Sequence, residues 1–260
     1  MTNKDDKWIE IFFENFFDES ATDERLIKCL NFKNEKIPNQ LYQYTKTKYA
    51  KDLLCNKLMY LRNIKDLNDP FEGDLLADLE KLNLEGWDEY KRTFKIVCFS
   101  ERNDINPMWA HYGDNHEGIC IEYNFNDNKN FKDQCMPINY VNSVDNDTLI
   151  KKLQKTGKSP KRLIWNVFSN KSEDWKYEKE WRLIYDNEVP ENIGTILSDN
   201  NNKKYLLFLK PTAVYLGLKI DEKDKKSIID MCNFNNIKIY KMKKSNSNYN
   251  LISSEIKNNN

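Results

Sequence analysis

Three features are missing from this chain of 260 residues, and each absence argues against a class of site. The six cysteines are scattered and none forms a Cys-x-x-Cys pair, which argues against a zinc ribbon. The seven glycines are dispersed, so no glycine-rich loop offers its backbone amides to a phosphate. No apolar run reaches the roughly 20 residues that a membrane-spanning helix needs. We therefore expect a protein without a zinc ribbon, a phosphate loop or a membrane anchor.

The chain also has no excess of positive or negative residues. Lys and Arg number 41, Asp and Glu number 41, and the net charge is +0. Such a chain has no overall attraction for nucleic acid or anionic lipid. Its first residues, Met-Thr-Asn-Lys-Asp-Asp-Lys, do not resemble a signal peptide, so the sequence predicts a cytoplasmic protein. Hydrophobic residues reach only 39%, but aromatic residues reach 13%, so we expect large rings to form much of the core.

Short apolar or alternating runs predict more strands than long helices, and the two do not alternate regularly. This order predicts an α+β fold with a mixed or antiparallel central sheet and flanking helices. We expect three parts: an N-terminal helical extension (1–38), an α+β domain (39–243) and a disordered tail rich in Ser, Asn and Lys (244–260). The predicted strands include residues 95–100, 118–125, 135–142, 181–185, 205–209, 213–218 and 237–240, and the predicted helices include 8–17, 74–92, 147–170 and 222–232.

The segment 8–17 carries large apolar side chains at helical spacing. Trp8, Ile9, Phe12 and Phe13 follow an i, i+1, i+4, i+5 pattern, which places them on one face of a helix. Packing on the protein's own core is the simpler interpretation of this face. The alternative is a contact with a partner or with a second copy of the chain.

A first polar segment, Asn68-Asp69-Pro70-Phe71-Glu72, surrounds a turn that Pro70 imposes. Asp69, Glu72 and Asp74 place three carboxylates within six residues. One interpretation is an Asx turn before a helix, where the helix dipole favours acidic side chains. The other is a loop that orients a polar ligand.

A second segment, residues 108–118, contains both histidines of the chain, His111 and His116. Histidine is the side chain most readily used as an acid, base or ligand near neutral pH. A metal site would need Asp114 to join them, and that spacing is not a recognised metal signature, so we expect no metal. Trp109 and Tyr112 instead favour an aromatic-walled pocket for a flat ring.

The third segment is Glu178-Lys179-Glu180-Trp181-Arg182. On an extended chain Glu178, Glu180 and Arg182 share one face. Two neighbouring carboxylates repel each other unless Arg182 or a ligand compensates, so one of them could have a raised pKa and act as a base. The simpler interpretation is a surface ladder of ion pairs, which contributes little to stability.

Taken together, these segments resemble an uncharacterised bacterial family, the domain-of-unknown-function family 2971. The resemblance implies no particular activity. It spans roughly residues 41–242 and rests on five stretches: Leu41-Tyr42-Gln43-Tyr44-Thr45, Asn68-Asp69-Pro70-Phe71-Glu72, Cys98-Phe99-Ser100, Met108-Trp109-Ala110-His111-Tyr112-Gly113 with Gly118-Ile119-Cys120-Ile121, and Glu178-Lys179-Glu180-Trp181-Arg182.

The order of elements more distantly resembles the ADP-ribosyltransferase fold, which implies NAD as the substrate and a protein or nucleic acid as the acceptor. The likeness implies that Glu180 is catalytic, helped by Glu178, which would activate the acceptor. Gln43 stands where that fold usually has Arg or His. In the predicted site, Tyr112 and His111 complete the reacting centre, and the residues that bind NAD are Tyr44, Thr45, Ser100, Trp109, Arg182, Asn68 and Asp69.

Three functions follow from these observations. The first is an NAD-consuming transferase or glycohydrolase, in a toxin or phage-defence setting that the resemblance implies. The second is a regulatory module that binds a nucleotide or peptide. The third is a nuclease that holds Mg²⁺ with Asp69, Glu72, Glu178 and Glu180. The site itself requires that Tyr44, Tyr112 and Glu180 line one cleft.

Overall fold

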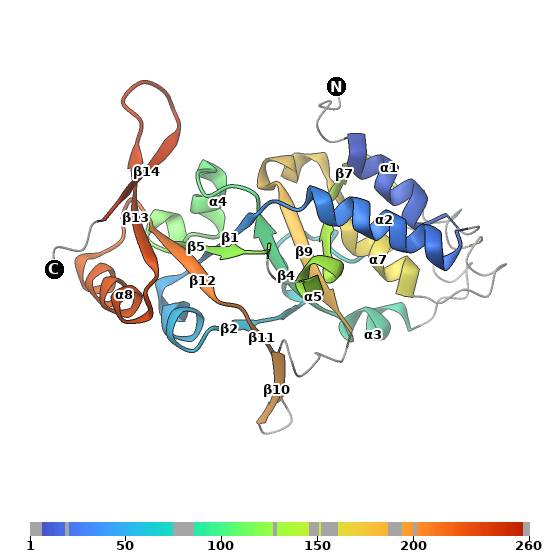
Figure 1. The fold of residues 1–260 in the computed structure, drawn as a ribbon, viewed down its shortest axis with the longest axis horizontal. Helices are drawn as coiled ribbons and strands as arrows, with labels where there is room; N and C mark the ends of the chain where they lie inside the picture. The colour runs from blue at the N-terminus through green and yellow to red at the C-terminus, as the bar shows by residue number, and fades with distance from the viewer. Residues whose placement is uncertain are drawn as a thin grey trace.

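The computed structural model describes most of the chain, and the fold is α+β as the sequence predicts (Figure 1). The described residues are 7–18, 21–74, 86–126, 129–145, 151, 161–186, 194–199 and 202–256. Within them no helix is long and apolar enough to span a membrane. Most of each predicted helix at 74–92 and 147–170 lies outside the described residues, although α3 (Trp87–Arg92) and α7 (Lys161–Ser169) form their ends.

The central sheet is mixed but mostly antiparallel. Its strand order is β14-β13-β12-β5-β1-β4-β9-β6, with β3 pairing β4, and only β12 and β13 run parallel. The strands are β1 (Gln40–Thr45), β3 (Arg62–Asn63), β4 (Lys95–Ser100), β5 (Ile119–Asn124), β6 (Cys135–Pro137), β9 (Glu180–Tyr185), β12 (Pro211–Leu216), β13 (Lys238–Lys244) and β14 (Leu251–Glu255).

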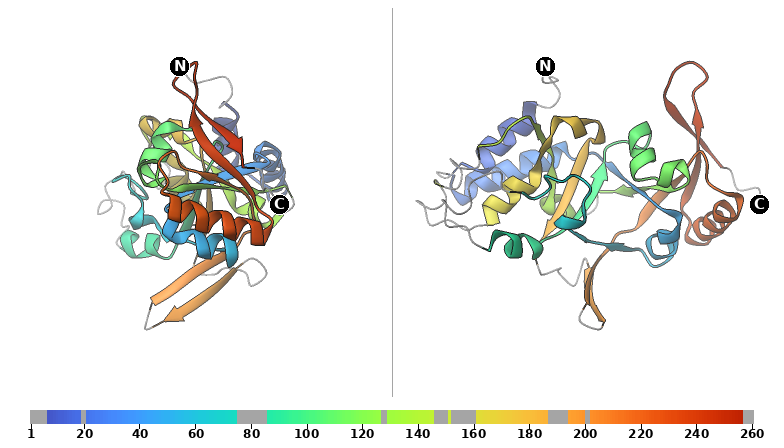
Figure 2. Two further views of the ribbon diagram at one scale, coloured as in Figure 1. Left: turned by 90° about the vertical axis from the view of Figure 1, so that its left-hand side faces the viewer. Right: turned by 180° about the vertical axis from the view of Figure 1, so that it is seen from behind.

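Two smaller sheets flank this one. One contains β10 (Gly194–Asp199), β11 (Asn202–Phe208) and β2 (Leu58–Tyr60), and its β10–β11 hairpin projects from the body (Figure 2). The other pairs β7 (Asn139–Val141) with β8 (Asn170–Ser172). The remaining helices are α1 (Lys7–Phe16), α2 (Asp23–Lys36), α4 (Asn106–His111), α5 (Lys129–Gln134) and α8 (Glu222–Asn235), and the short helical segments are η1 (Thr47–Tyr49), η2 (Lys51–Cys55), η3 (Ile64–Asp66), η4 (Asp114–His116) and η5 (Glu173–Glu178).

The two N-terminal helices lie beside α7 at one end of the sheet, and α8 lies at the other end (Figure 1). Phe12 and Phe13 of α1 are buried in one core cluster with Ile96 of β4 and Ile184 of β9. These rings pack on the protein's own core, which is the simpler of the two interpretations of residues 8–17. The helical extension therefore shares its core with the sheet.

The end of the chain differs from the prediction of a disordered tail. Residues 251–255 form β14, which pairs with β13 over five residues, from Tyr240↔Glu255 to Lys244↔Leu251. Leu251 is buried in a cluster with Met242 and Tyr215. The polar composition misled the prediction because an edge strand needs few apolar residues once its neighbour supplies the backbone hydrogen bonds.

A break between β1 and β4 positions the site. β1 pairs with β5 over six residues, and β4 pairs with β9 over six. Between β1 and β4, however, the register contains the single pair Tyr42↔Ser100. The two strands diverge from this point, so the sheet opens where a continuous ladder would have closed it.

Candidate functional site

A cavity of about 420 Å³ lies at this opening between β1 and β4. Its volume falls within the roughly 300–1,000 Å³ of small-molecule sites. Tyr44, Tyr112 and Glu180 line it together, so residues from distant parts of the sequence meet in one cleft. The other predicted residues on its wall are Thr45, Asn68, Glu72, Ser100, His111 and Glu178.

Arg182 of β9 is the centre of a buried ionic cluster behind this cavity. Its NH1 and NH2 donate to the two oxygens of Glu72 at 2.8 and 2.6 Å. Its Nε and NH2 donate to the two oxygens of Glu180 at 2.7 and 3.0 Å, and NH1 also donates to the Phe168 carbonyl at 2.8 Å. All five N–H groups of the guanidinium are therefore engaged. Arg182 fixes the first and third segments to each other and has no donor left for a cofactor, contrary to its predicted role in binding.

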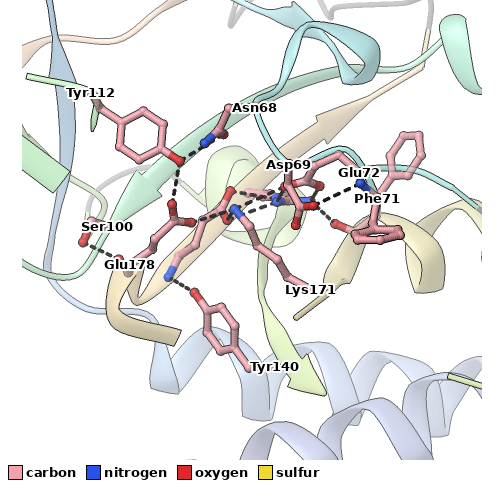
Figure 3. A network of polar contacts seen from close by, with 12 residues as sticks. Asn68, Asp69, Phe71, Glu72, Ser100, Tyr112, Tyr140, Lys171 and Glu178 are labelled. Carbon is pink, nitrogen blue, oxygen red and sulfur yellow. Dashed lines mark hydrogen bonds and ion pairs between the residues drawn. The ribbon is translucent and has the colours of Figure 1, made fainter. Parts of the chain in front are cut away.

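Lys171 of β8 is the second cation of the cluster, and no pattern in the sequence marks it. Its Nζ lies 2.6 Å from Glu178, 3.1 Å from Glu180 and 3.2 Å from Glu72 (Figure 3). The same group lies 4.9 Å from the ring centre of Trp175. Lys171 thus joins three carboxylates that come from three separate positions along the chain.

The cluster contains one more carboxylate than it has cations. If all five groups were ionised, Glu72, Glu178 and Glu180 would outnumber Lys171 and Arg182, for a net charge of 2 − 3 = −1. Glu178 is the carboxylate whose negative charge is least compensated. Burial and the neighbouring charge of Glu180 raise the pKa of Glu178 to about 7, against the opposing effects of Lys171 and Tyr112. Burial also acts to raise the pKa of Glu180, but Arg182 and Lys171 outweigh it and hold that pKa well below its usual range.

Tyr112 links Glu178 to Asn68. Its hydroxyl lies 2.6 Å from Glu178 Oε1 and 3.0 Å from Asn68 Oδ1. Burial, with the charge of Glu178, raises the pKa of Tyr112 above its usual value, so the phenol stays protonated. One hydroxyl has one proton. It donates to Glu178 when that carboxylate is ionised, and to Asn68 when a protonated Glu178 donates to Tyr112.

The path of the chain through the third segment differs from the extended strand that the sequence predicts. Glu178 ends η5, Lys179 has a left-handed φ of 48°, and β9 begins only at Glu180. Glu178 and Glu180 still converge, but they do so on Lys171, which lies across from both. The prediction of a compensated pair was sound, whereas the shared face of one strand was wrong.

Two further residues of the predicted site lie off the cavity. Trp109 is fully buried behind Tyr44, with ring centres 5.2 Å apart, and its Nε1 donates to the Asn103 carbonyl, so it is core and does not form a wall for a ligand. Asp69 forms the Asx turn, in which its Oδ1 accepts from the Phe71 amide at 3.0 Å. Asp69 faces a second cavity of about 250 Å³ instead.

Ser100 has a positioning contact in the site. Its hydroxyl donates to the backbone carbonyl of Glu178 at 2.6 Å, which holds the end of η5 against β4. His116 lies beside Trp109 with ring centres 6.5 Å apart, away from the cavity wall. In the part of the chain that the structure describes, no group of three or more His, Cys, Asp or Glu residues could hold a metal ion.

Cys98 lines the cavity, although its apolar run in the sequence is typical of a core thiol. Its position opposite Arg182 in the β4–β9 register brings its thiol to the ionic cluster. Burial and the charge of Glu180 raise the pKa of the Cys98 thiol well above its usual value. A protonated thiol is a poor nucleophile, so we assign Cys98 to the wall of the cavity.

Residues 108–183 match the model of a family described as a protein of unknown function, DUF2971. This stretch runs from α4 to β9 and includes Tyr112, Lys171, Glu178, Glu180 and Arg182. The match confirms the resemblance to that family over residues 108–183, which contain two of the five stretches that carry it, and the other three stretches lie outside the match. No curated protein and no solved structure matches the chain.

Proposed function

We propose that this chain is an enzyme that breaks the bond between a ribosyl group and nicotinamide in NAD, and passes the ADP-ribosyl group to water or to an acceptor. The observation that carries the proposal is the carboxylate of Glu178, which lines the cavity, shares its cation Lys171 with Glu72 and Glu180, and has a raised pKa. The likeness to ADP-ribosyltransferases supplies the choice of NAD.

The charge of the cluster suits this reaction. As nicotinamide leaves with the bonding electron pair, positive charge develops on the ribosyl carbon and its ring oxygen. An ionised Glu178 beside that carbon would stabilise the charge, more strongly because the carboxylate is buried. The same positive charge would in turn favour the ionised form of Glu178.

Glu178 would also transfer the proton. When water or an acceptor hydroxyl attacks the ribosyl carbon, it must lose a proton, and Glu178 would accept it as the base. Tyr112 would then take the hydrogen bond from the protonated carboxyl and donate its own to Asn68. Glu180 keeps its negative charge and pairs with Lys171 and Arg182. Lys171 also pairs with Glu178 and so holds that carboxylate in place. In this scheme Glu178 has the proton-transfer role and Glu180 the supporting one.

Purified protein mixed with NAD should release nicotinamide. Glu178 acts as a base only when it is ionised, so kcat should rise with pH and level off above an apparent pKa near 7. Chromatography of nicotinamide between pH 5 and 9, with water, added proteins or nucleic acid as acceptors, measures both. If no nicotinamide appears under any of these conditions and NAD does not shift the melting temperature, the proposal is wrong.

A second candidate is a regulatory module that binds a nucleotide or peptide without reaction. It is favoured by the saturated pairing of Arg182 with Glu72 and Glu180, which a purely structural cluster would also show. In that case NAD or another nucleotide would bind and remain intact. The third hypothesis, a nuclease, gains no support, because Glu72 and Glu180 already bind Arg182 and Lys171 in place of a metal ion.

The proposed biological setting is a toxin or phage-defence effector, because loss of NAD would stop the growth of a cell. Growth arrest on expression, with a fall in cellular NAD, would support that setting. Arrest without a fall in NAD would contradict it.

A further inference from the structure

We propose that Arg62 binds a phosphate group of the ligand at the mouth of the cavity, so that the site selects a nucleotide over the corresponding nucleoside. This inference rests on the proposed function for the identity of the inner group. The phosphate part of the inference is argued from the position and exposure of Arg62 and does not depend on the proposed reaction.

The cavity has an inner end and a mouth, which differ in exposure. Glu178 and Glu180 at the inner end are 2% and 6% exposed. Tyr49 and Tyr60 on the same wall are 37% and 38% exposed, and Arg62 is exposed beside Tyr60. Arg62 therefore belongs to the exposed part of the lining, and Glu178 to the buried part.

Arg62 differs from the other cations of the cavity. Lys171 is paired within the buried cluster, and Lys46 at the mouth is paired with Asp114 at 2.9 Å. Among the described residues, Arg62 has no salt bridge and no side-chain hydrogen bond. Asp66 also lines the mouth but forms no ion pair with it. A guanidinium presents a planar fork of N–H groups that matches two oxygens of a phosphate.

The position of Arg62 is set by the sheet. It lies on β3 and pairs in register with Ile96 of β4, which lines the cavity itself. β4 is the strand that diverges from β1 at the opening. The guanidinium is therefore carried by β3, which pairs with β4 beside the cavity, and this pairing fixes its backbone position.

The inner end of the cavity presents hydrogen-bond acceptors, which would bind a donor or a cation and not a phosphate. Gln43 of β1 lines the cavity, and its Oε1 is buried without a hydrogen-bond partner in the described structure. Glu178 adds a second acceptor there when it is ionised. A buried acceptor without a donor is unfavourable, so a ligand that brings an N–H group inward would satisfy Gln43, and a positive charge on that ligand would suit the ionised Glu178. Such a ligand has a cationic or N–H-bearing ring inside and a phosphate outside.

Two pairs of compounds separate the phosphate from the rest of the ligand. We would titrate nicotinamide riboside against nicotinamide mononucleotide, and adenosine against adenosine monophosphate, by calorimetry at low salt. The mononucleotide of at least one pair should bind about 10- to 100-fold more tightly than its nucleoside, as expected for charge-assisted hydrogen bonds to an arginine. In Arg62→Gln that difference should disappear, while nucleoside binding stays within about twofold, because the nucleoside has no phosphate to lose.

Arg92→Gln is the matched control, because Arg92 is an exposed arginine of α3 that does not line the cavity. It should keep the full preference for the phosphate. The inference is overturned if Arg62→Gln leaves the preference intact, if it weakens nucleoside and nucleotide equally, or if none of the four compounds binds at millimolar concentration.

The outcomes also separate this inference from the proposed function. Phosphate-dependent binding through Arg62 without any release of nicotinamide from NAD would support the phosphate site and reject the reaction. Release of nicotinamide with an unchanged KM for NAD in Arg62→Gln would support the reaction and reject the phosphate site.

Discussion

Glu178→Gln should produce a protein that has lost its activity and gained stability at pH 8. The activity is expected to fall by about 100- to 10,000-fold, because an amide cannot accept the proton from the attacking group. The gain in stability follows from the cluster charge. The substituted amide removes the unmatched charge and could still accept from Lys171 and donate to Tyr112, as protonated Glu178 does.

The direction of the pH effect follows from the raised pKa. The folded protein holds Glu178 at a pKa of about 7, above the ordinary value of 4.5, so between these values the folded state binds more protons than the unfolded state. Glu178 therefore favours folding at low pH, and that contribution is lost as the pH rises from 4.5 to 7. A tenfold change in proton affinity corresponds to about 1.4 kcal/mol, so the loss is about 3 kcal/mol. Glu178→Gln does not ionise and should escape it.

Urea unfolding at pH 5 and at pH 8 measures this difference. The variant and the wild type should have similar free energies of unfolding at pH 5, and the variant should be the more stable at pH 8. Glu173→Gln is the matched control, because Glu173 is an exposed glutamate of the same η5 segment, and it should change neither stability nor activity. A Glu178→Gln protein that is less stable than wild type at both pH values would contradict the charge count.

The central strands and the meeting of the polar segments could be predicted from the sequence because both depend on local patterns. The apolar runs that form β4 and β12 stand out in a polar chain. The turn at Asn68–Glu72 and the two glutamates beside Arg182 were unusual enough to be recognised without a structure.

Lys171 could not be predicted, for a physical reason. It is one of 41 Lys and Arg residues, and its neighbours Asn170 and Ser172 give no sign of burial. Its role arises only when the β7–β8 pair places it beside Glu178 and Glu180. The prediction for Trp109 was wrong in the opposite sense, because it placed a core residue in the site. From the sequence alone, an aromatic residue that could form a wall for a ligand serves equally well as core.

The position of Arg182 explains how the cavity keeps its shape. The guanidinium joins the turn at Glu72 to the start of β9 at Glu180, and both of those residues line the cavity. The two segments are more than a hundred residues apart, and no backbone pairing joins the turn to β9 among the described residues. The opening between β1 and β4 therefore depends on a side chain that does not itself contact the cavity.

Arg182→Met should destabilise the protein by about 3–5 kcal/mol, because it strands buried carboxylates without their cation. The net charge of the cluster would become 1 − 3 = −2, with Lys171 alone facing Glu72, Glu178 and Glu180. The melting temperature measures the loss, and Arg102→Met, which removes an exposed arginine paired with Asp104, should have little effect.

A double variant separates the lost charge balance from the lost packing. Glu72→Gln combined with Arg182→Met removes one carboxylate with the cation, so the net charge returns to 1 − 2 = −1, as in the wild type. If uncompensated charge is the main cost, the double variant should be more stable than Arg182→Met alone, although it carries a second change in the core. If the two losses simply add, the guanidinium stabilises the fold through its hydrogen bonds and its packing, and not through the charge that it balances.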